Sequence, residues 1–247
     1  MNHFISIEGD GEVNYLLIHT GSRNLGLQVA KYHQDVAAEN TIGNGIQDLI
    51  KSLKNSGQNS RIQESIELAN SSNKELAFLE GQAMQDYLHD VKIAQGFATE
   101  NRNEIARIIF EKMGWTLTEK IESVHNYIDT DEMILRKGAI SCKGTFLVPL
   151  NMRDGTLVCF GESNPAWNDS APHGAGRSMS RSRAKKELSL ESFQETMKDI
   201  WSASVNEKTL DEAPDAYKPA EEIKALLQEQ YTVIRHLKPL FNFKAQE

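Results

Sequence analysis

The fold and the chemistry of this chain centre on one stretch, Ser170-Ala171-Pro172-His173-Gly174-Ala175-Gly176-Arg177-Ser178-Met179-Ser180-Arg181. Its two glycines allow positive φ angles and a close approach of the backbone to a ligand. Its two arginines present planar guanidinium groups that match the oxygens of a phosphate. A histidine between these features can act as a nucleophile or a base on a phosphate group. A glycine-rich turn with a surface histidine is the alternative, because short motifs often arise by chance.

The totals describe a globular chain of 247 residues, long enough for one large domain or two small ones. Hydrophobic residues make up 39% and charged residues 25%, which is typical of soluble proteins. No apolar run reaches the length of a membrane span, and the first residues lack the pattern of a secretory signal. Cys142 and Cys159 form neither a disulfide framework nor a zinc pattern, so we expect no membrane and a reducing, cytoplasmic location.

The net charge of −8 argues against a protein that coats nucleic acids without specificity. A local basic groove is still compatible with it, because five basic residues follow His173 without an acidic one between them: Arg177, Arg181, Arg183, Lys185 and Lys186. A solvated helix face is the usual fate of such a run. Its place directly after His173 makes a phosphate-binding site an equally good interpretation.

The first half of the chain predicts two strands followed by helices. Alternation predicts strands over 4–7 and 13–18, and a helix over 25–33. The polar residues 19–23 between them could bind an anion at the helix N-terminus, whereas His19 alone is more typical of a structural histidine. Residues 39–60 have the composition of a loop, and 64–113 show apolar residues at helical spacing.

The second half predicts strands first and then helices. Strands are expected over 121–128, 133–140, 145–149 and 156–160, the last two joined by a turn at Asp154-Gly155. Helices are expected over 191–201 and 220–237. The chain shows no internal repeat and no clear linker, so we expect a single domain over 1–247.

Four of the seven histidines lie in contexts that suggest a site: His3, His19, His125 and His173. Three of them lie on predicted strands or strand ends, where a sheet holds side chains rigidly. Neutral imidazoles suit Zn, Mn, Fe or Ni. The remaining His33, His89 and His236 lie on predicted helices, and we expect them to be surface or packing residues.

A series of motifs runs along the chain: Asn2-His3-Phe4, His19-Thr20-Gly21-Ser22-Arg23, His125-Asn126, Arg136-Lys137-Gly138-Ala139, residues 172–181, Asp211-Glu212-Ala213-Pro214 with Tyr217-Lys218, and Lys244. In kind and order they resemble the RtcB family of RNA-splicing ligases. The resemblance covers essentially the whole chain. It implies an α+β fold with central β-sheets flanked by helices, of which this chain would be the C-terminal portion.

The resemblance implies that His173 is the nucleophile that attacks the α-phosphate of GTP and forms a histidine–GMP adduct. It implies a two-manganese centre with the ligands His3, His19 and His125. Contacts to GMP or RNA phosphates would come from Asn2, Arg23, Arg177 and Arg181. Guanylate binding would further involve Asn126, Asn151, Thr156, Gly174, Ala175, Gly176, Tyr217 and Lys244, with Asn151 and Thr156 standing where many relatives have serine.

The family's reaction joins an RNA 3′-phosphate or 2′,3′-cyclic phosphate end to a 5′-hydroxyl end, in tRNA splicing or RNA repair. Two further functions stay open at this point. The chain could be a catalytically impaired fragment that binds RNA or a nucleotide. It could also be a metal-dependent phosphodiesterase that uses the same histidines, in which case turnover would not need GTP.

The chain departs from the family's pattern at two places. Relatives carry an Asp and a Cys before the Asn-His-Phe motif, both as metal ligands, whereas this sequence starts at that motif. We therefore expect an N-terminally truncated chain whose missing ligands an upstream polypeptide could supply. Ser6 also stands where relatives often have a glutamate in the guanylate pocket. Glu8 lies two residues on and, by strand alternation, would face the same side as Ser6.

Overall fold

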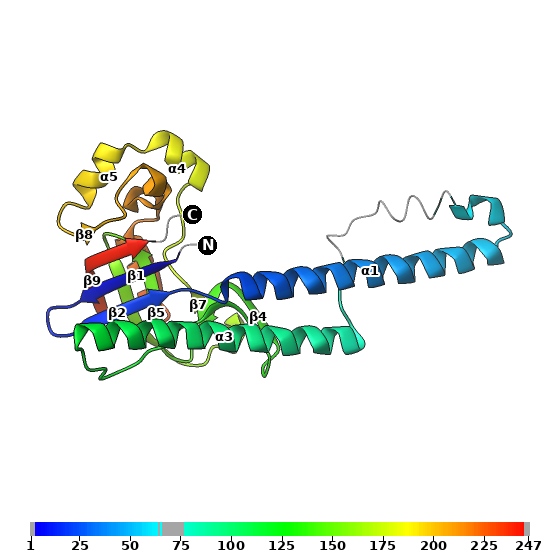
Figure 1. Ribbon diagram of the computed structural model, residues 1–247, viewed down its shortest axis with the longest axis horizontal. Helices are drawn as coiled ribbons and strands as arrows, with labels where there is room; N and C mark the ends of the chain where they lie inside the picture. The colour runs from blue at the N-terminus through cyan, green and yellow to red at the C-terminus, as the bar shows by residue number, and fades with distance from the viewer. Residues whose placement is uncertain (1–2, 64, 66–76, 245–247) are drawn as a thin grey trace. The chain divides into compact units, whose positions relative to one another are not determined.

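The computed structural model describes residues 3–63, 65 and 77–244, which Figure 1 shows as a coloured ribbon. The described residues divide into two compact units. The first combines the N-terminal residues up to Thr20 with those from Glu100 onward, and the second covers 21–99. All the strands belong to the first unit.

The larger sheet of the first unit has the order β2-β1-β9-β6-β5, and β8 pairs with β9 beside this path. Its strands are β1 (Phe4–Gly9), β2 (Asn14–His19), β5 (Gly144–Asn151), β6 (Gly155–Gly161), β8 (Trp201–Ser202) and β9 (Thr232–Lys244). Every pairing is antiparallel except that of β8 with β9. The turn between β1 and β2 forms because Asp10 accepts backbone hydrogen bonds from Glu12 and Val13, both at 3.1 Å.

The main core lies on β5 and β6, where apolar side chains are almost fully buried. Val148, Leu157 and Cys159 are each 0% exposed, as the apolar alternation of these strands predicts. The helix α6 (Ala220–Gln228) packs Ile223 and Leu227 against the same cluster. Burial of this kind contributes roughly 2 kcal/mol for each large aliphatic side chain.

A second, smaller sheet has the order β3-β4-β7 and is antiparallel throughout. It consists of β3 (His125–Asp129), β4 (Ile134–Ser141) and β7 (Ser170–Pro172). The central strand pairs Ile140 with His125 on one side and Ala139 with Pro172 on the other. One strand therefore fixes both His125 and the residue that precedes His173.

Short helices complete the first unit between β7 and β9. They are α4 (Arg181–Glu187), α5 (Leu190–Thr196), and the 3-10 turns η4 (Glu207–Glu212) and η5 (Pro214–Ala216); η3 (Pro165–Trp167) precedes β7. Serines cap both α-helices, since Ser180 accepts from the amide of Arg183 and Ser189 from that of Ser192. A separate apolar cluster around Phe193 and Met197 holds this segment together.

The second unit contains α1 (Arg23–Asn55), the turn η1 (Asn59–Arg61) and the start of α3 (Gly81–Met113), which continues into the first unit. The buried imidazole of His33 lies against Asp90 of α3, with 2.8 Å between Nε2 and Oδ2. His33 and His89 lie on helices as expected, and His33 is a packing residue. No helix among the described residues combines the length and apolarity that crossing a bilayer requires.

Three predictions of secondary structure were wrong. The helix expected over 191–201 ends at Thr196, and Trp201 begins β8. The loop expected over 39–60 is helical as far as Asn55, because Ile42, Ile46, Leu49, Ile50 and Leu53 recur at helical spacing and outweigh two glycines. The helix expected over 220–237 ends at Gln228, and Thr232 begins β9. The β-branched residues of this segment pair with β6, so His236 lies on a strand. Part of the helix predicted over 64–113 lies outside the described residues.

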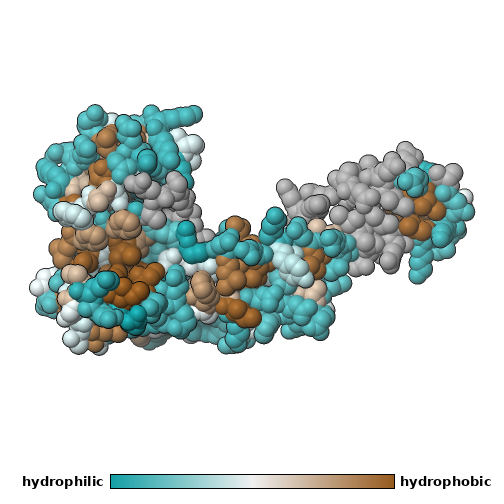
Figure 2. Space-filling view, in the orientation of Figure 1, coloured by the Kyte–Doolittle hydropathy of each residue, from teal (hydrophilic) through white to brown (hydrophobic). Residues whose placement is uncertain are grey.

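The α+β class expected for the chain agrees with these mixed elements. One face of the larger sheet remains open among the described residues, and Figure 2 shows apolar side chains gathered over β1 and β9. Leu240 and Phe243 of β9 are 53% and 48% exposed. Some apolar side chains of these strands are thus not covered by the other described residues.

Candidate active site and its phosphate-binding cluster

The side chain of His173 is oriented by the backbone of β4. Its Nδ1 lies 2.7 Å from the carbonyl oxygen of Gly138. Because a carbonyl only accepts hydrogen bonds, Nδ1 carries the proton and Nε2 keeps the lone pair. Gly138 has a φ of 68°, and a Cβ placed there would lie 3.7 Å from Cε1 of His173. The positive φ explains the glycine, since a Cβ at this position would make only ordinary van der Waals contact with the ring.

Asn126 holds the same glycine from the other side. Its Oδ1 accepts a hydrogen bond of 2.6 Å from the amide of Gly138, and Asn126 itself has a φ of 54°. Asparagine tolerates this left-handed conformation better than most residues. The register of β3 on β4 shifts at this point, between His125 and Tyr127. The Asn126 side chain is therefore engaged with the strand that positions His173.

Four rings form a continuous column that runs from β1 to His173. Phe4 stacks on His19 with 4.9 Å between centroids, His19 contacts His125 at 4.8 Å, and His125 stacks on His173 at 5.1 Å. Burial lowers the pKa of His19 to about 3, and His125 and His3 lower it further. Burial and His173 lower the pKa of His125 to about 4. These imidazoles are therefore neutral at physiological pH.

Neutral imidazole is the form that binds a transition metal, so the donor set of His3, His19 and His125 suits part of such a site. Within the described residues, no group of three His, Cys, Asp or Glu side chains is arranged to hold a metal ion. Two of the three rings lie against one another in the column. Manganese also prefers carboxylate ligands, and none of the column's members is acidic. The imidazoles fit a metal centre only together with anionic ligands from elsewhere.

Arg177 belongs to a second cluster of side chains, which forms around η4 and η5. Its guanidinium donates to the carbonyls of Met179 at 3.0 Å and Asp211 at 2.6 Å. It also lies over the ring of Tyr217, 5.1 Å from the centroid, and the two residues form an isolated β-bridge. The backbone of the His173 stretch is thereby tied to the segment that contains Asp211.

Glu212 is the centre of that cluster. Its Oε2 accepts hydrogen bonds from Tyr217 at 2.6 Å and from Lys244 at 2.8 Å. Arg181 contacts both carboxylates, at 3.2 Å from Glu212 and 2.9 Å from Asp211. The two acids are 5% and 4% exposed. Three of the five cations expected to form a basic groove, Arg177, Arg181 and Lys185, therefore form ion pairs with two buried carboxylates, which offset part of their positive charge.

The glycine-rich backbone after His173 packs on β5. The amide of Ala175 donates to the carbonyl of Pro149 at 3.1 Å, and a Cβ on Gly174 would lie 2.9 Å from the same oxygen. Gly176 has a φ of 71°, and no atom lies within 4 Å of its Cβ position. The close packing explains the glycine at 174, and the positive φ explains the one at 176.

Asn151 and Thr156 lie in the hairpin between β5 and β6. Asn151 accepts hydrogen bonds from the amides of Arg153 and Asp154, at 3.0 and 2.9 Å, and donates to the Asp154 carboxylate at 2.8 Å. Thr156 is 1% exposed. Both side chains thus take part in the structure of the hairpin.

Ser6 and Glu8 face the same side of β1, as strand alternation predicts. The Ser6 hydroxyl donates to Oε1 of Glu8 at 2.7 Å, and both residues are buried. Burial raises the pKa of Glu8 to about 7, although Ser6 and Thr156 oppose this. A buried acid in this state can exchange a proton near neutral pH.

For two expected contact residues the structure gives no placement at this site. Arg23 begins α1 and belongs to the second unit, with a φ of 53°. Asn2 lies outside the described residues. The candidate site is thus built from the rings of β1, β2 and β3, the His173 turn, and the Glu212 cluster.

Sequence analysis assigned no role to two residues that the structure places at this site, Gly138 and Glu212, or to Arg136, which is buried in the sheet that carries it. Gly138 and Arg136 stand in a motif already noted, and Glu212 in another. A glycine that follows an apolar strand and a lysine hinted at a positive φ, but its partner His173 is 35 residues away. Only the fold brings such pairs together.

Comparison with known proteins gives a match over nearly the whole chain. The sequence profile of the family described as "tRNA-splicing ligase RtcB" matches residues 2–245. The "RNA-splicing ligase RtcB" of Escherichia coli (strain K12) is 29% identical over 259 residues, which cover 96% of this chain and 58% of that protein. The "tRNA-splicing ligase RtcB" of Aeropyrum pernix is 28% identical over 253 residues, covering 87% of this chain and 48% of that protein. The chain thus spans about half the length of these relatives.

Proposed function

Because the chain belongs to the RtcB family, we propose that it is the part of an RNA ligase that carries the nucleophile His173. The substrates are RNA 3′-phosphate or 2′,3′-cyclic phosphate ends, RNA 5′-hydroxyl ends, and GTP. The relatives that support this bear the names of RNA-splicing ligases and are longer than this chain. Cytoplasmic tRNA splicing or RNA repair is the corresponding role.

The hydrogen bond between His173 and Gly138 is the observation that carries the proposal. It holds the proton on Nδ1 and leaves the Nε2 lone pair available for attack on phosphorus. Nε2 forms a bond to the α-phosphorus of GTP, and pyrophosphate leaves with the electron pair of the broken P–O bond. The ring then carries positive charge, which the carbonyl of Gly138 stabilises through Nδ1–H. A 3′-phosphate oxygen of RNA next takes the GMP and returns the electron pair to Nε2.

The joining step follows at the activated RNA end. The 5′-hydroxyl oxygen attacks the phosphorus of the former 3′-phosphate and loses its proton to solvent, and GMP leaves with the electron pair of the broken P–O bond. A 2′,3′-cyclic phosphate must first be opened by water to yield the 3′-phosphate. Arg177 and Arg181 are suited to stabilise the phosphate oxygens during these displacements.

His3, His19 and His125 would hold manganese, because burial keeps His19 and His125 neutral and their rings lie together. When bound, the metal would offset the triphosphate charge and make the α-phosphorus more electrophilic. The anionic ligands would come from an upstream Asp and Cys, on the same polypeptide or on a separate one. With imidazoles alone, we expect weak manganese binding.

Guanylate binding is proposed for residues that surround His173 and the Glu212 cluster. Tyr217 and Lys244 now donate hydrogen bonds to Glu212 and would donate them to a bound nucleotide instead. Other proposed contacts are Asn2, Arg23, Asn126, Asn151, Thr156, Gly174, Ala175, Gly176 and Arg177. Glu8, which is hydrogen-bonded to Ser6, would take the role of the glutamate that relatives often have at the Ser6 position.

The proposal is tested with α-³²P-labelled GTP and Mn²⁺, on the chain alone and with the upstream segment of the E. coli relative added. We expect a protein-bound label that is labile to acid, as a phosphoramidate is. His173→Asn should abolish the label, whereas His89→Asn, on an exposed position of α3, should not. If no label forms in either mixture, the ligase function of this polypeptide is refuted.

A binding module without catalysis is the second candidate, because the cations near His173 are paired with buried carboxylates. It predicts RNA or GTP binding without the labelled adduct. The third candidate, a metal-dependent phosphodiesterase, predicts processing of RNA ends in the absence of GTP.

A further inference from the structure

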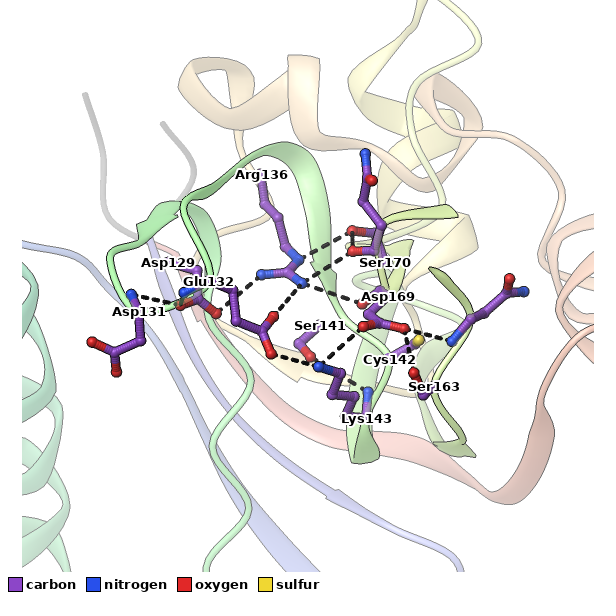
Figure 3. A network of polar contacts seen from close by, with 12 residues as sticks. Asp129, Asp131, Glu132, Arg136, Ser141, Cys142, Lys143, Ser163, Asp169 and Ser170 are labelled. Atoms are coloured by element: carbon purple, nitrogen blue, oxygen red, sulfur yellow. Dashed lines mark hydrogen bonds and ion pairs between the residues drawn. The ribbon is translucent and has the colours of Figure 1, made fainter. Parts of the chain in front are cut away.

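Arg136 is a buried cation at the centre of the small sheet. It lies on β4, is 2% exposed, and contacts both neighbouring strands (Figure 3). On the β3 side, Nη1 donates to the hydroxyl of Tyr127 at 2.9 Å and lies 3.4 Å from Asp129. On the β7 side, Nε donates to Oγ of Ser170 at 3.0 Å. A guanidinium in this place joins all three strands.

The second terminal nitrogen of Arg136 reaches an unusual piece of backbone. Nη2 donates to the carbonyl oxygens of Asn168 at 3.1 Å and Asp169 at 3.4 Å. These two residues have φ angles of 49° and 48°. Two successive left-handed residues that are not glycine cost roughly 1 kcal/mol each or more. Contacts to the carbonyls on both are suited to offset that strain.

The charges around Arg136 are arranged to keep this segment in place. Asp169 forms ion pairs and hydrogen bonds with Lys143 at 3.0 Å and Ser163 at 2.8 Å. Lys143 also pairs with Glu132, which lies 3.8 Å from Arg136. The amide of Cys142 donates to the carbonyl of Asp169 at 2.9 Å. Asn168 and Asp169 are therefore held through their backbone carbonyls and through the side chain of Asp169.

This segment leads directly to the nucleophile. Asn168 and Asp169 precede β7, which pairs with β4 from Ser141 to Ala139, and His173 follows β7 immediately. The same strand β4 supplies the Gly138 carbonyl to Nδ1 of His173. The alignment of β7 on β4 thus sets whether the ring meets that carbonyl. A change in the left-handed pair would shift this alignment.

We infer that Arg136 is a positioning residue for His173: by holding Asn168 and Asp169 left-handed, it sets the alignment of β7 that brings Nδ1 to Gly138. This inference rests on the proposed function of His173 as nucleophile. Arg136 itself touches neither His173 nor a substrate. An arginine that serves stability alone would not be coupled to the conformation of Asn168.

Two substitutions test the coupling. Arg136→Lys keeps the charge among the acids but loses the planar fork that reaches both carbonyls and Tyr127. Asn168→Gly removes the steric cost of the positive φ, so the pair no longer depends on the guanidinium. Arg107→Lys is the matched control, because Arg107 pairs only with exposed glutamates on α3.

The first measurement is the tautomer of His173 by ¹⁵N NMR on histidine-labelled protein, which needs neither GTP nor metal. The unsubstituted chain and Arg107→Lys should show the Nδ1–H form. Arg136→Lys should show a mixture of the two forms, and Arg136→Lys with Asn168→Gly should return to Nδ1–H. Retention of Nδ1–H in Arg136→Lys would overturn the inference.

The second measurement is the rate of the labelled adduct under the conditions given above. Arg136→Lys should slow it roughly 10- to 100-fold, as small misplacements of a reacting group do. Adding Asn168→Gly to Arg136→Lys should raise this rate again by at least about fivefold. Asn168→Gly alone should leave the rate of the unsubstituted chain unchanged. Recovery of the melting temperature without recovery of rate and tautomer would indicate a structural role and refute positioning. Absence of label in the unsubstituted chain would instead refute the ligase function, while the tautomer measurement still decides on Arg136.

Discussion

The ring column and the Glu212 cluster lie in the same unit of the chain, but one consists of uncharged rings and the other of ion pairs. In the column, burial lowers the pKa of His19 and His125, so that adjacent imidazoles stay neutral. In the cluster, two buried carboxylates pair with Arg181 and Lys244. Lys244 joins the two regions, since its ammonium also lies 5.7 Å from the centre of the Phe4 ring. Charge is avoided in one region, whereas in the other two carboxylates offset part of the charge of Arg177, Arg181, Lys185 and Lys244.

This difference shows which part of the candidate site is preorganised for a ligand. The proposed nucleophile, His173, has its tautomer fixed by the backbone carbonyl of Gly138 without any ligand. The cations, in contrast, already have anionic partners, so phosphate oxygens must share or replace the carboxylates. Net binding energy in the cluster is therefore smaller than the number of positive charges implies, because an exchange of ion pairs largely cancels.

The strongest test of the column is the replacement of its terminal ring. His173→Asn should reduce formation of the labelled adduct by ~10³-fold or more, because a nucleophile has no substitute within the site. The Glu212 cluster remains intact, so GTP binding measured by calorimetry should change little. An adduct that survives this substitution would move the nucleophile out of the column.

Removing the central charge of the cluster should mainly affect stability. Glu212→Gln leaves Lys244 and Arg181 with a neutral partner in a buried position, which should lower the free energy of unfolding by about 3 kcal/mol. Glu187→Gln breaks an exposed pair with Arg183 and should cost less than about 0.5 kcal/mol. Urea unfolding of both variants gives the comparison. Equal losses of unfolding free energy would show that the ion pairs of Glu212 contribute no more to stability than an exposed ion pair.

Glu8 lies on β1, the strand that carries Phe4 of the column and pairs with β9, which carries Lys244. Its pKa is about 7 in the folded chain against an ordinary value of 4.5, so between these pH values the folded state binds more protons. Stability therefore falls as pH rises from about 4.5 to 7, by up to about 3 kcal/mol.

Glu8→Gln isolates this contribution, because other titrating groups are common to both proteins. The difference in unfolding free energy between Glu8→Gln and the unsubstituted chain should grow in favour of the variant from pH 4.5 to 7 and then level off. Urea unfolding across this range measures it. A difference that is independent of pH would show that Glu8 is not buried as an acid.

The smallest effect separates backbone strain from the support of His173. Gly138→Ala and Gly144→Ala both place a Cβ on a residue with positive φ, 68° and 81°. Each should destabilise the chain by about 1–2 kcal/mol. The strain at 138 acts on the residue whose carbonyl oxygen lies 2.7 Å from Nδ1 of His173, whereas a Cβ at 144 would meet nothing within 4 Å. Gly138→Ala, and not Gly144→Ala, should therefore slow adduct formation, as measured with labelled GTP.

The sequence predicted most strands of the fold because their alternation is local. It failed over 220–237, where the β-branched residues around Val233 form a strand only through distant pairing with β6. The same limit applies to the site. His173 could be singled out from its glycines and arginines, but the support of its Nδ1 comes from a backbone carbonyl, which carries no residue signature. Likewise, Glu212 is recognisable as a hub only after η4 has folded against β9.

The central place of β9 also has a consequence for the order in which the protein is made. β9 lies between β1 and β6, and Phe4 pairs with Lys244 across nearly the whole length of the chain. During synthesis, β1 must therefore wait for its neighbour until the residues between the two strands have left the ribosome. Sheets closed by such distant partners form slowly. Phe4 of the ring column and Lys244 of the Glu212 cluster come together only when β9 pairs with β1, so the two regions of the candidate site are joined late in folding.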